Sequence, residues 1–135
     1  MNPSKAFVFA HHDSAGLLRQ NTRQLLERLS KEGHVVLVST NLTTEEANSA
    51  PANINIITRE NVGYDFYSYK IGLESLKNPE KYTHVCILNS SFISFDPDQL
   101  VAKFLSRLDA SIDALGLTFS REISPHLQSF FSAFS

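Results

Sequence analysis

Three short polar segments carry the side chains in this sequence that could bind a charged ligand. They are HHDSAG at residues 11–16, RENVGYD at residues 59–65 and NSSF at residues 89–92. Carboxylates at Asp13 and Asp65 can accept hydrogen bonds from hydroxyl or amide groups, whereas Arg59 and Lys70 can offset the charge of a phosphate. Gly63 has no Cβ atom and lets the backbone approach a ligand closely. These residue types favour the binding of a phosphate-containing molecule.

Strands and helices that alternate along the chain are predicted to position these segments. Apolar runs of strand length occur at residues 6–10, 34–40, 53–58, 85–88 and 114–118. The third alternates like an edge strand, and the fourth is continuous, as expected at the centre of a sheet. Spacing and capping signals predict helices over residues 17–31, 65–76 and 97–108, with a short helix after the capping box of residues 43–46. In the helix over residues 65–76, Tyr69, Leu73 and Leu76 form the expected buried stripe.

The order of these elements predicts the α/β fold class, as a Rossmann-like, mostly parallel sheet with helices on both faces. In such sheets, ligands bind beyond the carboxyl ends of the strands, where helix N-termini present backbone N–H groups to phosphates. All three polar segments follow predicted strands, so we expect them to meet at one edge of the sheet. The length of 135 residues predicts a single domain over residues 1–135.

Composition narrows the classes of function further. The formal net charge is -2 and the basic residues are scattered, which argues against nucleic acid as the ligand. Cys86 is the only cysteine, which excludes an internal disulfide and favours a reducing, cytoplasmic location. Its apolar neighbours favour a buried structural thiol over a nucleophile. The apolar run at residues 6–10 is too short for a signal peptide or a transmembrane segment.

Four segments, in this order along the chain, resemble signatures of the rhamnan synthesis protein F family. They are FAHHD at residues 9–13, RENVGYDF at residues 59–66, ILNSSF at residues 87–92 and PHLQSFF at residues 125–131. The likeness spans residues 7–134. It implies a domain similar to the N-terminal nucleotide-binding part of a glycosyltransferase A fold. It also implies a rhamnosyltransferase-like enzyme that moves a sugar from a nucleotide-activated donor to rhamnan, O-antigen or a similar cell-surface polysaccharide.

The resemblance further implies where the substrates bind. Donor-binding residues are expected in and near the three polar segments: His11, Asp13, Arg59, Asn61, Gly63, Asp65, Lys70, Asn89, Ser90 and Ser91. His126 and Gln128 are expected on the acceptor or sugar side. The donor would be dTDP-rhamnose, a UDP-sugar or a GDP-sugar. The acceptor would be a glycan or lipid-linked glycan, reached at the inner face of the cell membrane.

The catalytic base and any metal site stay unassigned at this stage. The family pattern has an aspartate where this sequence has Ser90. Binding with Mg²⁺ or Mn²⁺ through neutral oxygens and binding without metal are therefore both open. The adjacent His11 and His12 do not predict a zinc site, because neighbouring side chains at a strand end point in different directions.

Several residues also have purely structural interpretations. Asp13 and Asp65 lie where helices are expected to begin, so N-capping explains them without a ligand. The aromatic residues at positions 64, 66, 67 and 69 could stack on a base or sugar, or simply pack. The apolar residues Leu127, Phe130, Phe131 and Phe134 have no later partner in the chain, which favours homodimerisation or docking of a further segment.

Three functions stay open on this basis. The working hypothesis is a transferase domain that binds a nucleotide-sugar donor. The second is a non-catalytic nucleotide-sugar-binding or assembly module of a polysaccharide biosynthesis system, favoured by Ser90 and by an interpretation of the chain as truncated at its C-terminus. The third is a metal-dependent phosphate-ester hydrolase that uses His11, His12 and Asp13, although no nucleophile elbow or P-loop spacing is present.

Overall fold

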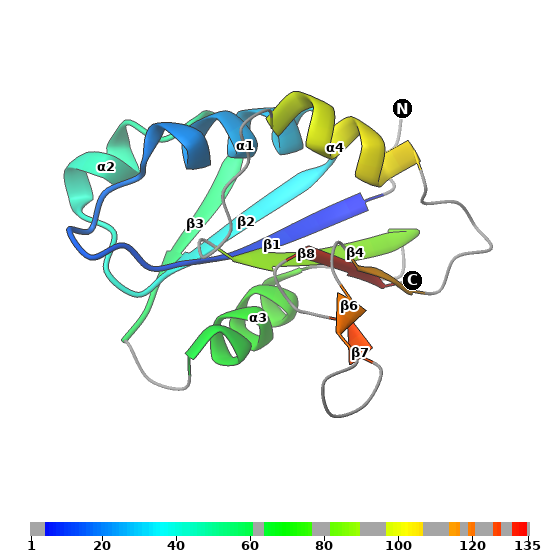
Figure 1. Cartoon of the computed structure of the whole chain (residues 1–135). Coiled ribbons are helices and arrows are strands. Elements are labelled where there is room, and N and C mark those ends of the chain that lie inside the picture. Colours follow the sequence, from blue (N-terminus) through cyan, green and yellow to red (C-terminus); the bar gives the residue numbers. More distant parts are fainter. Residues whose placement is uncertain are drawn as a thin grey trace.

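The computed structural model describes residues 5–60, 64–76, 82–89, 97–106, 114–116, 119–120, 126–127 and 131–134. Strands and helices alternate along most of this part of the chain (Figure 1). The helices are α1 (Gln20–Ser30), α2 (Thr44–Asn48), α3 (Tyr64–Ser75) and α4 (Pro97–Ser106). The strands are β1 (Lys5–His11), β2 (His34–Ser39), β3 (Ile54–Thr58), β4 (His84–Asn89), β5 (Ala114–Gly116), β6 (Phe119–Ser120), β7 (His126–Leu127) and β8 (Phe131–Phe134).

The main sheet has the strand order β3-β2-β1-β4-β8-β5. Neighbouring strands from β3 to β4 are parallel, and β8 pairs antiparallel to both β4 and β5. The α/β, Rossmann-like and mostly parallel sheet that the sequence predicts is therefore confirmed. The predicted edge position of the third strand and the inner position of the strand at residues 85–88 are confirmed as well. Strands β6 and β7 form a separate antiparallel pair.

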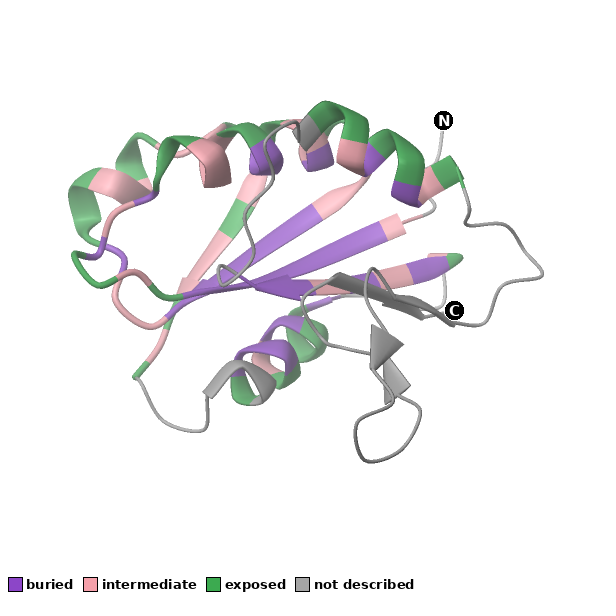
Figure 2. Ribbon diagram, in the orientation of Figure 1, coloured by how far each residue is buried: buried purple, intermediate pink, exposed green. Residues whose placement is uncertain are grey.

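Helices cover both faces of this sheet, as predicted. Helices α1 and α4 lie along one face, here named the α1/α4 face, and α3 lies on the opposite one, the α3 face (Figure 1). The pleat of β1 shows the two layers directly. Phe7 and Phe9 belong to the core under α1 and α4, whereas Ala6, Val8 and Ala10 belong to the core under α3. The inner strands β1 and β2 are accordingly buried along almost their whole length (Figure 2).

Helix α1 begins at Gln20 rather than at the predicted Leu17. The amide of Leu17 donates to the Asp13 carboxylate at 3.2 Å, and the amide of Leu18 donates to Glu46 at 3.3 Å. These side chains hold the segment before the helix in place, and Leu18 is still buried within the core. Its place in the leucine pattern therefore reflects burial in the connecting segment rather than a helical turn.

The buried stripe of α3 differs from the predicted one. Tyr69 and Leu76 are buried as expected, but Leu73 is 41% exposed. A helix turns by about 100° per residue, so a stripe centred on Gly72 includes Ser68, Tyr69 and Leu76 but leaves Leu73 at its margin. Gly72 lies so close to β1 that an added Cβ would be 2.3 Å from Val8 Cγ1. The prediction was wrong because it followed the large apolar residues and ignored the glycine.

The apolar C-terminal segment is part of the sheet. Strand β8 pairs through its backbone with β4 on one side and with β5 on the other. Residues 131–134 thus pair with earlier parts of the chain, and the expectation that the apolar segment mediates homodimerisation or docking of a further segment stays a prediction. An antiparallel strand inserted into an otherwise parallel sheet is a common arrangement, but it leaves no periodicity signal in a segment this short.

Capping signals were more reliable than the leucine pattern. Thr43 occupies the N-cap of α2, and its hydroxyl accepts a hydrogen bond from the Glu46 amide at 3.3 Å. The reciprocal half of the capping box is absent from this site, since the Thr43 amide donates to the Gly16 carbonyl oxygen at 3.1 Å. Pro97 is the first residue of α4, as predicted.

Candidate functional site

The carboxyl ends of the four parallel strands form one edge of the sheet, here named the carboxyl edge. It consists of His11, Ser39, Thr58 and Asn89 together with the residues that follow them. His11 lies beside Ser39, and Ser39 lies beside Thr58. The order β3-β2-β1-β4 changes direction between β1 and β4, and α/β sheets bind ligands beyond the carboxyl ends at such a point.

The pleat divides the polar side chains of this edge between the two faces. In β1, Phe9 belongs to the core of the α1/α4 face. Because side chains alternate along a strand, the side chain of His11 lies on that face and the side chain of His12 lies on the α3 face. The same alternation separates Ser39 from Thr40 at the end of β2. Backbone hydrogen bonds continue the ladder past the strand ends, from the Thr40 amide to His11 at 3.1 Å and from the Arg59 amide to Ser39 at 2.9 Å. The neighbouring histidines therefore belong to different environments.

On the α1/α4 face, His11 makes a closed set of internal hydrogen bonds. Its Nε2 donates to the Leu17 carbonyl oxygen at 3.1 Å, which leaves Nδ1 to accept from the Ser39 hydroxyl at 2.7 Å. The Ser39 hydroxyl oxygen in turn accepts from the amides of Asn41 and Leu42, at 3.2 and 2.9 Å. Burial lowers the pKa of His11, and the occupied Ser39 oxygen cannot readily accept a proton from Nδ1. His11 is thus neutral and holds the loops together.

Asp13 organises the loop between β1 and α1. Its carboxylate accepts from the amides of Ala15 and Leu17 and from the guanidinium of Arg19, whose Nε lies 2.8 Å away. The Arg19 hydrogen bonds are the largest cause of a pKa well below the usual range of an aspartate. The N-capping interpretation of Asp13 is wrong, because Arg19 occupies the N-cap position of α1 and Asp13 precedes it.

Asn41 joins the loop after β2 to the loop after β1, a role that was not predicted from the sequence. Its side-chain oxygen accepts from the Asp13 amide at 3.2 Å, and its side-chain nitrogen donates to the Asp13 carbonyl oxygen. Gly16 approaches the same residue with a positive φ of 71°, and an added Cβ would be 2.7 Å from the Asn41 carbonyl oxygen. Position Asn41, directly after a predicted strand and in an ST-N sequence, was the available signal for this role.

On the α3 face, Arg59 and Lys70 converge on the ring of Tyr67. The Arg59 Nε donates to the Ser68 hydroxyl at 2.8 Å, and its Nη1 donates to the Glu60 carbonyl oxygen at 2.6 Å. The Arg59 guanidinium lies 5.1 Å from the centre of the Tyr67 ring, and the Lys70 ammonium lies 6.0 Å from it. Tyr67 is 43% exposed, so a ligand could reach its ring, whereas Tyr69 is buried.

Two further polar side chains lie at the α3 face. Thr40 Oγ1 and His12 Nδ1 are 2.6 Å apart, and His12 is exposed. Asn89, at the end of β4, is buried beside β1 opposite Ala10. By the pleat of β4, where Val85 and Ile87 pack on the α3 side, Asn89 belongs to that side as well. The ends of all four parallel strands therefore contribute polar groups to the α3 face.

Several predicted site residues cannot be placed in the same way. Asn61, Gly63, Ser90, Ser91 and Gln128 lie outside the described residues. Asp65 is the second residue of α3, inside its first turn rather than at the N-cap, and His126 begins β7. For Asp65 and His126 only the backbone is described. Their roles in binding stay predictions.

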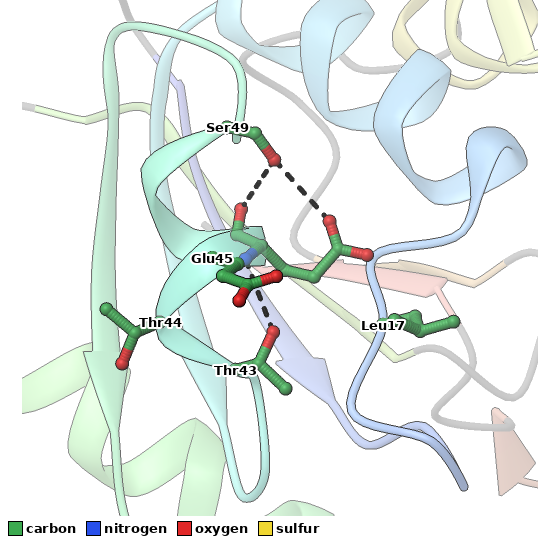
Figure 3. A pocket seen from close by; sticks show the side chains of 6 residues that line it. Leu17, Thr43, Thr44, Glu45 and Ser49 are labelled. Atoms are coloured by element: carbon green, nitrogen blue, oxygen red, sulfur yellow. Dashed lines mark hydrogen bonds between the residues drawn. The ribbon is translucent and has the colours of Figure 1, made fainter.

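A hollow of about 550 Å³ opens between α2 and the segment that precedes α1 (Figure 3). Its lining residues are Leu17, Thr43, Thr44, Glu45, Glu46 and Ser49. The Glu46 carboxylate in its wall is bound by Arg23, which also donates to the carbonyl oxygens of Leu18 and Ser49. None of the predicted donor-binding residues lines this hollow. The Arg23 contacts join α1 to α2 and account for the position of Glu46 without a ligand.

The remaining candidates for chemistry are Cys86, as a nucleophile, and groups of acidic, histidine or cysteine side chains, as metal ligands. Burial raises the pKa of the Cys86 thiol to about 12, which opposes a nucleophilic role, and its predicted burial is confirmed. Within the described residues, no three His, Cys, Asp or Glu side chains come together as a metal site would require. The described helices also include none that is long and apolar enough to span a membrane.

The fold and the carboxyl edge define a doubly wound α/β domain with polar side chains at its strand-order switch. A family model described as Rhamnan synthesis protein F matches residues 35–135. The chain belongs to the rhamnan synthesis protein F family, which confirms the resemblance seen in the sequence. The match contains three of the four segments that carried this resemblance, and residues 9–13 lie outside it. No curated protein matches the chain.

Proposed function

We propose that this chain binds a nucleotide-activated sugar at the α3 face of its carboxyl edge for transfer to rhamnan or a related cell-surface polysaccharide. The observation that carries this proposal is the position of Arg59. Its guanidinium is fixed at the end of β3 by Ser68 and the Glu60 carbonyl oxygen, and it lies over the exposed ring of Tyr67. A preoriented cation at this edge suits a diphosphate, and the family match supports a role in polysaccharide synthesis.

The proposed transfer reaction needs several groups. The leaving nucleoside diphosphate carries negative charge, which Arg59 and the more exposed Lys70 would offset. Asp65, in the first turn of α3, would accept hydrogen bonds from the ribose or the base. Asn89 would contribute a neutral polar group at the end of β4, with or without Mg²⁺ or Mn²⁺. The general base that takes the proton of the acceptor hydroxyl is unassigned.

The acceptor side follows from the same proposal. A rhamnan-type glycan, free or lipid-linked, would approach from the side of β7. His126 is the first residue of this strand, and Gln128 follows it in the sequence. The site of transfer would be the cytoplasmic face of the membrane, where nucleotide sugars and lipid-linked glycans meet. The donor nucleotide would be dTDP, UDP or GDP.

Isothermal titration with UDP, GDP and dTDP, with and without Mg²⁺ or Mn²⁺, tests donor binding. One nucleotide is expected to bind saturably, and Arg59→Gln is expected to weaken that binding about tenfold or more, because a hydrogen bond to a charged group is lost. Lys103→Gln is the matched control, since Lys103 is an exposed cation on α4 at the opposite face. Absence of binding to all three nucleotides by the folded chain, or equal binding by Arg59→Gln, would contradict the proposal.

A non-catalytic binding or assembly module is the second candidate, favoured by Ser90 in place of the family's aspartate. It shares the nucleotide site but lacks turnover. Incubation with dTDP-rhamnose and a rhamnan acceptor distinguishes the two functions. Release of dTDP together with a lengthened glycan supports the transferase, and binding without either product supports the module.

A further inference from the structure

We propose that the hollow beside α2 binds a saccharide unit of the glycan on which the protein acts. This inference goes beyond the proposed donor site and rests on the proposed function only for the identity of the glycan. The hollow has a volume of about 550 Å³ and lies between α2 and the segment that precedes α1 (Figure 3). This volume is within the range of about 300–1,000 Å³ that small-molecule sites occupy. The described lining holds two carboxylates, three hydroxyls and one apolar side chain, Leu17.

The walls of the hollow are held in place by internal contacts. The Thr43 amide donates to the Gly16 carbonyl oxygen at 3.1 Å, which ties the start of α2 to the loop after β1. Arg23, on α1, donates to the carbonyl oxygens of Leu18 and Ser49 at 2.9 and 2.7 Å. These hydrogen bonds join α2 to α1 and to the segment before α1. A ligand therefore meets a preformed hollow and does not have to order its walls, which lowers the cost of binding.

The Glu46 carboxylate in the wall has its charge balanced but can still accept a hydrogen bond. Arg23 binds its Oε2 atom, and the Leu18 amide donates to its Oε1 atom at 3.3 Å. The Ser49 hydroxyl lies 3.4 Å from Oε2. A carboxylate has about four acceptor sites, and 19% of the Glu46 side chain is accessible, so it can accept a further bond from a ligand. Because the Arg23 guanidinium offsets its charge, Glu46 suits a neutral hydroxyl group better than a cation.

The other lining groups also suit a neutral ligand with many hydroxyl groups. The Thr43 hydroxyl accepts from the Glu46 amide at 3.3 Å, and within the described part of the chain its hydrogen has no acceptor. The exposed Glu45 carboxylate makes no hydrogen bond or ion pair with any described residue. Leu17 lies across the hollow from Thr43 and offers an apolar surface (Figure 3). A sugar matches this pattern, since its hydroxyl groups donate and accept hydrogen bonds while its C–H groups pack on an apolar side chain.

Anions and metal ions fit the hollow less well. Its described lining contains no basic side chain, and the two carboxylates disfavour a phosphate. Across the described residues as a whole, no three His, Cys, Asp or Glu side chains come together as metal ligands. The hollow therefore differs in chemistry from the proposed donor site, which is built around cations.

The hollow lies next to the carboxyl edge. The carbonyl oxygen of Leu17, one of its lining residues, accepts from His11 Nε2 at 3.1 Å, and His11 ends β1. Ala47 of α2 packs against the core under α1 and α4, so the hollow is on the α1/α4 face, whereas the proposed donor site is on the α3 face. A glycan whose reacting end lies at the donor site reaches the hollow by crossing this edge. The saccharide unit in the hollow is thus remote from the reacting hydroxyl.

Nuclear magnetic resonance titration with a rhamnose trisaccharide tests this site. The backbone amides of Leu17, Glu46 and Ser49 are expected to shift saturably in the folded chain. Glu45→Ala is expected to weaken binding about tenfold, because a hydrogen bond to a charged group is lost. Glu27→Ala is the matched control, since Glu27 is an exposed acidic residue of α1 outside the hollow. This control should bind the trisaccharide as the wild type does.

The inference fails if the folded wild type does not bind the trisaccharide, if the shifts lie away from the hollow, or if Glu45→Ala binds equally well. It also fails if spermidine produces the same shifts with higher affinity, because the hollow is then a cation site. Parallel titrations with UDP, GDP and dTDP separate this inference from the proposed function. If a nucleotide binds while the trisaccharide does not, the proposed function stands and the saccharide site fails. If the trisaccharide binds in the hollow while no nucleotide binds, the saccharide site stands and the proposed donor fails.

Discussion

His11 and His12 show how far residue types alone can define a site. The sequence correctly indicated that the two side chains diverge, and each is paired with a hydroxyl on the next strand, at 2.7 and 2.6 Å. It gave no means to tell which one is buried, because apolar residues occupy both faces of β1. The expectation that His11 binds the donor is untested, but its contacts favour a structural role.

The lowered pKa of His11 predicts a specific loss of stability in acid. The unfolded chain takes up a proton at His11 as the pH falls through about 6.5, while the folded chain resists it. The contribution of His11 to the free energy of unfolding is therefore complete above that pH. Below it, this contribution decreases by at most about 1.4 kcal/mol per pH unit. Urea unfolding between pH 7.5 and 5.5 measures the slope.

Two substitutions isolate the contribution of His11 to that slope. His11→Gln is expected to flatten the decline in unfolding free energy, because the buried imidazole is absent. His34→Gln is expected to retain the wild-type slope, since His34 lies at the partly exposed start of β2. If the slopes of the wild type and His11→Gln coincide, His11 is not the neutral buried group described above.

Among the elements, strands were easier to predict than helix faces. The β-branched and apolar runs of β1, β2 and β4 are long enough to be recognised and lie within the sheet as expected. The predicted start of α1 was wrong because the carboxylates of Asp13 and Glu46 bind the backbone amides of Leu17 and Leu18. Neither contact is visible in the spacing of the leucines. The α3 stripe was wrong because a glycine that packs closely on a strand adds nothing to a hydrophobic pattern.

The packing of α3 on β1 gives a paired prediction. Gly72→Ala places a methyl group 2.3 Å from Val8 Cγ1 and 3.3 Å from Val38 Cγ2, so α3 must shift away from the sheet. We expect a net loss of about 1–2 kcal/mol, since overpacking outweighs the better helix propensity of alanine. The control Leu73→Ala, at a 41% exposed position, is expected to cost less than about 1 kcal/mol. Urea unfolding measures the loss of stability in both variants. A larger loss in Leu73→Ala would contradict the packing described here and support the predicted stripe that includes Leu73.

For the whole molecule, the fold class and the mostly parallel sheet follow from the alternation of elements. The same reasoning does not reach β8, because its place between β4 and β5 depends on long-range pairing rather than on local pattern. The expectation that the polar segments meet at one edge of the sheet is confirmed for their described residues, whereas binding at that edge stays a prediction. Assignment of the candidate site to one face required knowledge of which helices pack there, which only the folded structure provides.

The inner position of β8 predicts that its backbone is essential to the fold. Ser132 lies opposite Ile87 on one side and Gly116 on the other. Ser132→Pro removes an amide from a strand that is paired on both sides, and we expect it to destabilise the domain by about 2–4 kcal/mol. Ser132→Ala keeps the amide and serves as the control. Thermal unfolding followed by circular dichroism measures both, and equal stability of the two variants would contradict the inner position.

The central claim is that a nucleotide occupies the α3 face of the carboxyl edge. The most direct measurement is a map of backbone amide shifts by nuclear magnetic resonance during titration with the nucleotide that binds. We predict that the amides of His12, Thr40, Arg59 and Asn89 shift together, while those of Leu29 and Val101 on the α1/α4 face do not. Shifts confined to the α1/α4 face, or to the hollow beside α2, would contradict the account.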